Sequence, residues 1–106
     1  MTRVVENNIW TGFSDTATAD TFVKIIDFDT TRQMLKIHNR SHDKYLKVAF
    51  SEEDAMNDIC IAMCPDGLFD QTNFCPTNEI WIAGEGADVV VNWWLDQRDL
   101  IKFDLK

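Results

Sequence analysis

Basic residues are missing from half of this chain. The 106 residues carry 18 acidic and 10 basic side chains, for a net charge of −8, and residues 48–97 contain ten acids but neither lysine nor arginine. A protein with this balance repels the phosphates of DNA and RNA, which supply most of the affinity in nucleic-acid binding. The charge therefore excludes a nucleic-acid binder that relies on phosphate attraction.

The chain also lacks long apolar runs. None approaches the ~20 apolar residues that span a bilayer, and the first eight residues lack the apolar stretch of a signal peptide. We therefore expect no membrane partner and synthesis in the cytoplasm without secretion.

Cysteine is scarce, and its number is odd. Cys60, Cys64 and Cys75 do not suit a disulfide framework, and cytoplasmic thiols stay reduced. Their spacing, even with His38 or His42 added, matches no common zinc site. We expect free, buried thiols and no metal.

Catalytic signatures are absent as well. No residue pair suggests a nucleophile with its base, and no phosphate loop or dinucleotide fingerprint occurs. Asp27 and Asp29 lack the glycine and glutamate of a calcium loop. We expect neither an enzyme nor a bound cofactor.

What the sequence does have is β periodicity. Apolar types make up 45% and charged types 26%, as in an ordinary folded domain. Residues 22–28, 35–38, 46–50 and 59–63 suit strands, with 35–38 and 46–50 pairing as a hairpin, whereas Ser51 caps one short helix at 51–57 and residues 68–78 look irregular. Pro65-Asp66-Gly67 forms a turn in which the glycine permits positive φ. The pattern predicts an all-β fold, a single small antiparallel jelly-roll-like β-sandwich with at most one short helix.

The last two apolar runs predict a second hairpin with a turn at Glu85-Gly86. The register that pairs Ile82 with Val89 puts the aliphatic residues and Trp93 on one face. The other face then carries the contact candidates Trp81, Val90, Asn92 and Trp94. Either other parts of the chain cover this second face or it contacts a subunit or partner.

The first twenty residues are mostly polar. Ile9, Trp10 and Phe13 are apolar anchors within this strip. We expect residues 1–20 to form an extended arm that reaches a neighbour, and residues 21–106 to form the sandwich. On this hypothesis, a chain without residues 1–14 still folds but no longer assembles.

The order of these features resembles small β-sandwich structural proteins of tailed bacteriophages, of the head decoration, cement or tail-accessory type. The resemblance lies in the turn Ile37-His38-Asn39-Arg40-Ser41, in the strand that ends at Phe50 and in residues 84–94. It implies a non-enzymatic virion subunit that binds neighbouring capsid or tail proteins, as identical copies in a closed oligomer such as a trimer.

Two other functions fit the composition. The acidic segment 48–97 suits a phage-encoded inhibitor that binds a basic host protein, with a salt-sensitive affinity. Alternatively, the chain is a carbohydrate-binding module in which Trp94, Asn92 and Gln97 contact a sugar.

Overall fold

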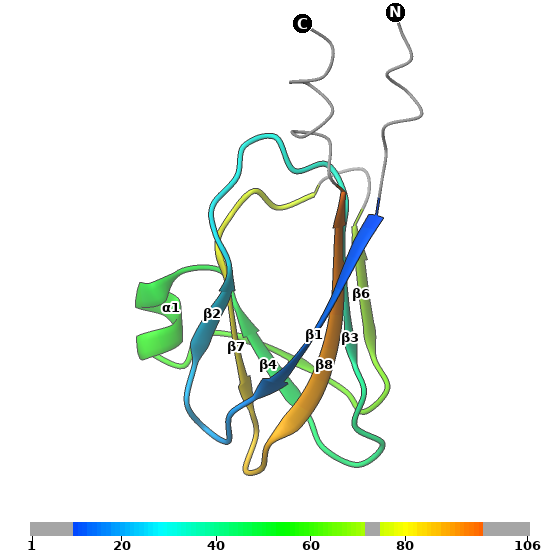
Figure 1. The fold of residues 1–106 in the computed structure, drawn as a ribbon. Coiled ribbons are helices and arrows are strands. Elements are labelled where there is room, and N and C mark those ends of the chain that lie inside the picture. The colour runs from blue at the N-terminus through cyan, green and yellow to red at the C-terminus, as the bar shows by residue number, and fades with distance from the viewer. Residues whose placement is uncertain (1–9, 72–74, 97–106) are drawn as a thin grey trace, which may run out of the picture.

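The computed structural model describes residues 10–71 and 75–96, which form two facing four-stranded sheets (Figure 1). Sheet A has the strand order β1-β8-β3-β6, and sheet B has the order β2-β7-β4-β5. All pairings between these strands are antiparallel. The strands are β1 (Trp10–Ala17), β2 (Val23–Ile26), β3 (Leu35–Asn39), β4 (Leu46–Ala49), β5 (Ile61–Met63), β6 (Leu68–Gln71), β7 (Ile80–Gly84) and β8 (Val89–Asp96). This order is that of an eight-stranded jelly roll, and the predicted fold class is confirmed.

The core lies between the sheets and is made of alternate residues of the strands. Leu35 and Ile37 of β3, Ile80 and Ile82 of β7 and Val91 of β8 are each at most 1% exposed. Complete burial of one such aliphatic side chain stabilises the fold by about 1.5–3 kcal/mol. The period-two pattern therefore gave the correct inward face for these strands.

The two predicted hairpins are wrong, although their inward faces are right. β3 and β4 lie in opposite sheets, and so do β7 and β8. Strand β8 pairs with β1 and β3, and Ile82 pairs with Val23 and Val48 instead of Val89. Alternation cannot distinguish the two cases, because a hairpin and a pair of facing strands bury the same residues.

Tight packing at Gly84 fixes the crossing from β7 to β8. A Cβ atom at Gly84 would lie 1.9 Å from the carbonyl oxygen of Ala87. The backbone of Gly84 also accepts a hydrogen bond from the Asp20 N–H (2.7 Å) and donates one to the Thr18 carbonyl (2.9 Å). The segment that we expected to be a hairpin turn thus connects the two sheets and is held by the chain leaving β1.

The expected N-terminal arm is replaced by a strand of the sandwich over its described part. All eight residues of Trp10–Ala17 pair with β8, from Trp10 opposite Asp96 to Ala17 opposite Val89. Ala17 is 1% exposed, within the core. Among the described residues the sandwich therefore begins at Trp10, and removal of residues 1–14 would delete five of the eight residues of β1. Residues 1–9, including Ile9, lie outside the described part.

The helix of the described residues was predicted correctly, and β6 was missed in addition to β1. Helix α1 (Glu52–Met56) starts after Ser51, whose Oγ accepts a hydrogen bond from the Asp54 N–H (3.1 Å). Strand β6 lies in the region expected to be irregular, at an edge of sheet A. In the turn before β6, Asp66 adopts the positive φ (60°), whereas Gly67 is needed because a Cβ atom there would lie 2.8 Å from the Cys64 carbonyl oxygen.

Candidate functional site

The outer face of sheet A brings together side chains from four strands. Because paired residues share a face, the register sets Gly12, Trp94, Lys36 and Asp70 in one row across β1, β8, β3 and β6. The next row, related in the same way, contains Ser14, Asn92, His38 and Leu68. In these two rows, polar side chains therefore lie beside the Trp94 ring and Leu68.

The Trp94 indole lies over the backbone of β1 at Gly12. A Cβ atom at Gly12 would lie 2.7 Å from Trp94 Nε1 and 2.9 Å from Trp94 Cδ1. Only glycine leaves room for the ring at this position, because every other residue would place a carbon atom too close to it. The missing side chain of Gly12 thus allows the half-buried indole to lie against β1.

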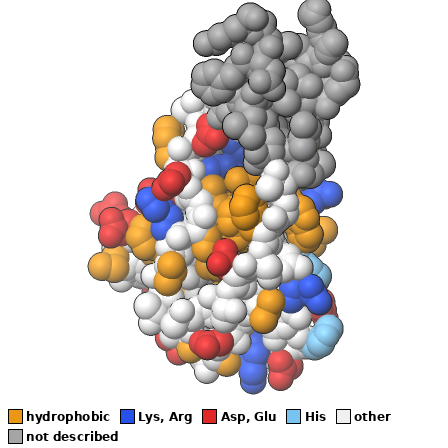
Figure 2. All heavy atoms as spheres, in the orientation of Figure 1, with side chains coloured by type: hydrophobic (Ala, Val, Ile, Leu, Met, Phe, Trp, Pro, Cys, Tyr) orange, Lys and Arg blue, Asp and Glu red, His pale blue; other side chains and the backbone are white. Residues whose placement is uncertain are grey.

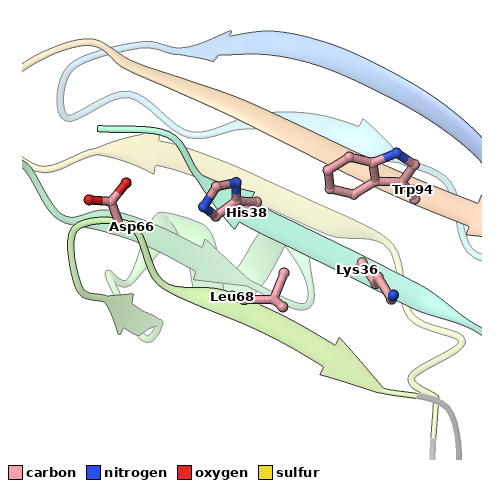
Figure 3. Close-up of a pocket in the computed structure, with 5 residues that line it drawn as sticks. All are labelled: Lys36, His38, Asp66, Leu68 and Trp94. Carbon is pink, nitrogen blue, oxygen red and sulfur yellow. The ribbon is translucent and has the colours of Figure 1, made fainter. Parts of the chain in front are cut away.

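A groove of about 570 Å³ opens beside this ring, which we call the Trp94 groove. Its lining residues come from β8, β3, β6 and the turn before β6 (Figure 3): Lys36, His38, Asp66, Leu68 and Trp94. Its size falls within the range of small-molecule sites, and it combines apolar side chains with a few polar ones, as such sites do.

Two of the acidic side chains around the groove have a nitrogen-containing side chain as partner. Lys36 Nζ lies 3.9 Å from Asp70 Oδ2, and His42 Nδ1 lies 2.9 Å from Asp66 Oδ2. Among the described residues, the half-buried His38 ring has no hydrogen-bond partner. The groove therefore offers donors and acceptors, and its lining includes one basic and one acidic side chain, Lys36 and Asp66.

The predicted contact residues are divided between two opposite faces. Val90, Asn92 and Trp94 lie on the outside of sheet A, whereas Trp81 lies in sheet B, on its outer side. Trp81 Nε1 donates a hydrogen bond to Glu79 Oε1 (2.8 Å), and the same oxygen accepts one from the Glu52 N–H (3.1 Å) at the start of α1. The single strip predicted from the sequence is thus wrong, since Trp81 is tied to α1.

The aromatic residues expected in the arm belong to the sandwich. Phe13 stacks on Trp93, with ring centroids 4.2 Å apart and an interplanar angle of 18°. Trp93 is 6% exposed and donates from Nε1 to Asp15 Oδ2 (3.2 Å). Trp10 begins β1, and Gln97 lies outside the described residues. Phe13 therefore anchors β1 to its own sandwich.

Three exposed apolar side chains lie at the end of helix α1 and in the residues that follow it. Met56, Ile59 and Ile61 are 80%, 60% and 43% exposed, and we call these three residues the Met56 surface. Ile61 begins β5, which pairs with β4 on one side and forms an edge of sheet B. Figure 2 shows acidic and apolar side chains gathered over α1.

The acids of segment 48–97 are dispersed by the crossings between sheets. Glu52, Glu53 and Asp54 lie on α1, whereas Asp66 and Asp70 lie at β6 on the other sheet. The connection between β7 and β8 carries two more acidic residues, Glu85 and Asp88. No single acidic face collects all the charge of this segment, and the densest group adjoins the Met56 surface.

The three cysteines are free, but none of them is fully buried: Cys64 is exposed, and Cys60 and Cys75 are half-buried. The expectation of buried thiols is therefore wrong. Within residues 10–71 and 75–96, no three His, Cys, Asp or Glu side chains form a group that could hold a metal. In that same part of the chain, no helix has the length and hydropathy to cross a membrane.

We expect Cys64 to react with a thiol reagent several-fold faster than Cys60 at pH 8. Burial raises the pKa of Cys60, and the nearby Asp58 carboxylate raises it further, so that less of the reactive thiolate is present. Stopped-flow reaction with Ellman's reagent of wild type, Cys60→Ser and Cys64→Ser measures the rates. A fast phase that survives Cys64→Ser would contradict this assignment.

Comparison with known proteins assigns the chain to no family. No family model and no curated protein matches the chain. A solved structure from Bacillus endospore appendages, described as disulfide-linked pili, is 11% identical and has a TM-score of 0.37 over 85% of this chain and 92% of its own. A similarity at this level supports no inference about function.

Proposed function

We propose that the protein is a non-enzymatic virion subunit, a capsid decoration (cement) or head–tail accessory protein, that docks through the Met56 surface onto a neighbouring capsid or tail protein. The sequence resemblance to small phage β-sandwich proteins supports this role. Jelly rolls also occur in viral capsid proteins, although this is an analogy of fold alone. The observation that carries the proposal is the exposure of Met56, Ile59 and Ile61 beside an open strand edge.

The Met56 surface has the composition of a protein contact. Three large apolar side chains within six residues are exposed, and exposed apolar side chains mark an interaction site where they form one contiguous patch. Strand β5 presents backbone groups at the sheet edge, which a strand of another protein can pair with. The partner is thus expected to bring an apolar patch and an extended segment.

The charge beside this surface selects the partner. Glu52 and Glu53 are exposed on α1, one helical turn before Met56, and Asp58 lies two residues after it. Lys47 Nζ contacts Asp58 Oδ1 (3.1 Å), whereas the helix has no basic residue in its last turn. Two copies meeting through this surface would bring acidic rims together, so the partner is a different protein with a basic rim. Identical copies in a closed oligomer would need another contact.

The acidic residues beside the Met56 surface also support a second candidate function. A phage-encoded inhibitor that captures a basic host protein would use complementary charge in the same way. The two functions differ in the identity of the partner, which a cross-linking experiment determines.

A photo-reactive amino acid at position 59 is expected to cross-link to a capsid or tail protein. The full-length variant is produced during infection by the phage that encodes it, and illumination is followed by virion purification and mass spectrometry. The apolar contact around Ile59 places the probe within reach of the partner. The double variant Met56→Ser, Ile59→Ser should reduce the amount of the protein in virions at least tenfold.

The matched controls are the photo-reactive residue at position 23 and Val23→Thr, because Val23 is also exposed (46%) but lies in β2, at the other edge of sheet B. Thermal unfolding confirms that each variant is folded. Absence of the protein from virions would refute the proposal, and a cross-link from position 59 to a basic host protein would replace it by the inhibitor function.

A further inference from the structure

We propose that the Trp94 groove binds a neutral carbohydrate, with one pyranose ring packed on the Trp94 indole. This inference rests on the outer face of sheet A and is independent of the Met56 surface. The sequence suggested a sugar at Trp94 with Asn92 and Gln97, whereas the structure sets Trp94 in a groove with Lys36, His38, Asp66 and Leu68.

The Trp94 indole is already held in place in the protein alone. Trp94 is the large aromatic side chain of the groove, and Gly12 leaves it room to lie over β1. The indole is therefore held by the adjacent strand and does not have to be ordered by the ligand. A preorganised aromatic surface of this kind suits a ligand with a flat apolar face, such as the C–H face of a pyranose.

The polar side chains of the groove match the hydroxyl groups of a sugar. Lys36, His38 and Asp66 extend from two further segments toward the same groove (Figure 3). Lysine donates hydrogen bonds, a carboxylate accepts them, and imidazole does both. Sugar hydroxyl groups also donate and accept, so this mixture matches a polyhydroxylated ligand.

The charged side chains at the groove favour a neutral ligand. The ammonium group of Lys36 lies near Asp70 (3.9 Å), and the imidazole of His42 lies near Asp66 (2.9 Å). A phosphate or carboxylate ligand would have to compete with Asp70 for Lys36 and would meet the carboxylate of Asp66, and a cationic ligand would meet Lys36. A neutral ligand avoids both costs. The charge pairing therefore favours a neutral sugar over an anionic or cationic one.

The shape of the groove suits a ligand longer than one sugar ring. The groove lies along an open sheet face, and its volume of about 570 Å³ exceeds what a single hydroxylated ring needs. Leu68 is 57% exposed and gives the groove a second apolar wall. The site thus suits an internal stretch of an oligosaccharide, with one ring on Trp94 and its neighbour toward Leu68.

The test uses the full-length protein on an array of neutral oligosaccharides that contains glucans, galactans, mannans and N-acetylglucosamine chains. Isothermal titration calorimetry measures the affinity of each positive oligosaccharide. Trp94→Ala should weaken binding roughly tenfold or more, because the stacking surface is lost. His38→Ala should weaken it several-fold and should not disturb the fold, since the ring has no partner among the described residues.

Trp81→Ala is the matched control, because Trp81 is also a half-buried tryptophan on an outer sheet face but lies on sheet B. Its affinity for the oligosaccharide should equal that of the wild type. Three outcomes would overturn the proposal: no binding by any of these oligosaccharides at millimolar concentration, equal binding by Trp94→Ala and wild type, or Trp94-dependent binding of a proline-rich peptide instead of a sugar. None of these outcomes depends on whether the Met56 surface docks in a virion.

Discussion

Replacement of Asn39 by leucine should lower the free energy of unfolding by about 3–5 kcal/mol. The Asn39 side chain is completely buried, and its Nδ2 donates to the carbonyl oxygens of Lys44 (2.9 Å), Met63 (3.3 Å) and Cys64 (3.1 Å). Its Oδ1 accepts a hydrogen bond from the Ser41 N–H (2.9 Å). Leucine has a similar size, so the expected loss comes from backbone groups left without partners rather than from a cavity. Urea unfolding followed by circular dichroism measures the change.

The matched control is Asn57→Leu. Asn57 is exposed, and its Nδ2 donates to the Glu53 carbonyl (2.9 Å), so its loss should cost about 1 kcal/mol or less. Asn39→Asp should be at least as unfavourable as Asn39→Leu, because a carboxylate would face carbonyl oxygens. If Asn39→Leu were no less stable than Asn57→Leu, the buried asparagine would not hold the crossing from β3 to β4.

Replacement of Arg32 by methionine should lower the free energy of unfolding by about 3–4 kcal/mol. Arg32 is 5% exposed. Its Nη1 donates to the carbonyl oxygens of Pro76 (2.6 Å) and Asn78 (2.9 Å), and its Nη2 donates to that of Asp27 (2.6 Å). The guanidinium thus joins the connection between β2 and β3 to the segment before β7. Guanidinium chloride unfolding measures the loss.

Two further variants separate charge from geometry. Arg32→Lys keeps the positive charge but replaces the fork of donors by one ammonium group, and it should recover less than half of the lost stability. Arg40→Met removes an exposed arginine and should change stability by about 0.5 kcal/mol or less. Full stability of Arg32→Lys would show that charge alone suffices and would contradict the proposed role of the three carbonyl contacts.

The candidate site was only partly predictable from the sequence. Period two placed Val90, Asn92 and Trp94 together on an outward face, and the structure agrees. The same period in β3 made Lys36 and His38 outward residues, but nothing local showed that β3 lies beside β8. The contact between Gly12 and Trp94 needs the pairing of β1 with β8, which joins residues more than seventy positions apart.

Trp81 shows the limit of this reasoning most clearly. Its outward orientation was correct, but the predicted strip required β7 and β8 to be neighbours in one sheet. The structure sets them in opposite sheets, so their outward faces point away from each other. The acid-rich segment is divided between the two sides of the molecule for the same reason.

The sequence by itself determined the fold class, the inward face of the strands and the capped helix, because these depend on alternation and on interactions within a few residues. Tertiary structure alone decided which strands are neighbours, where the acids lie and which aromatic residues are exposed. Those features depend on the crossings between sheets. The crossings are fixed by close backbone packing at Gly84 and by the buried donors of Asn39 and Arg32, whose partners lie up to 46 positions away in the chain.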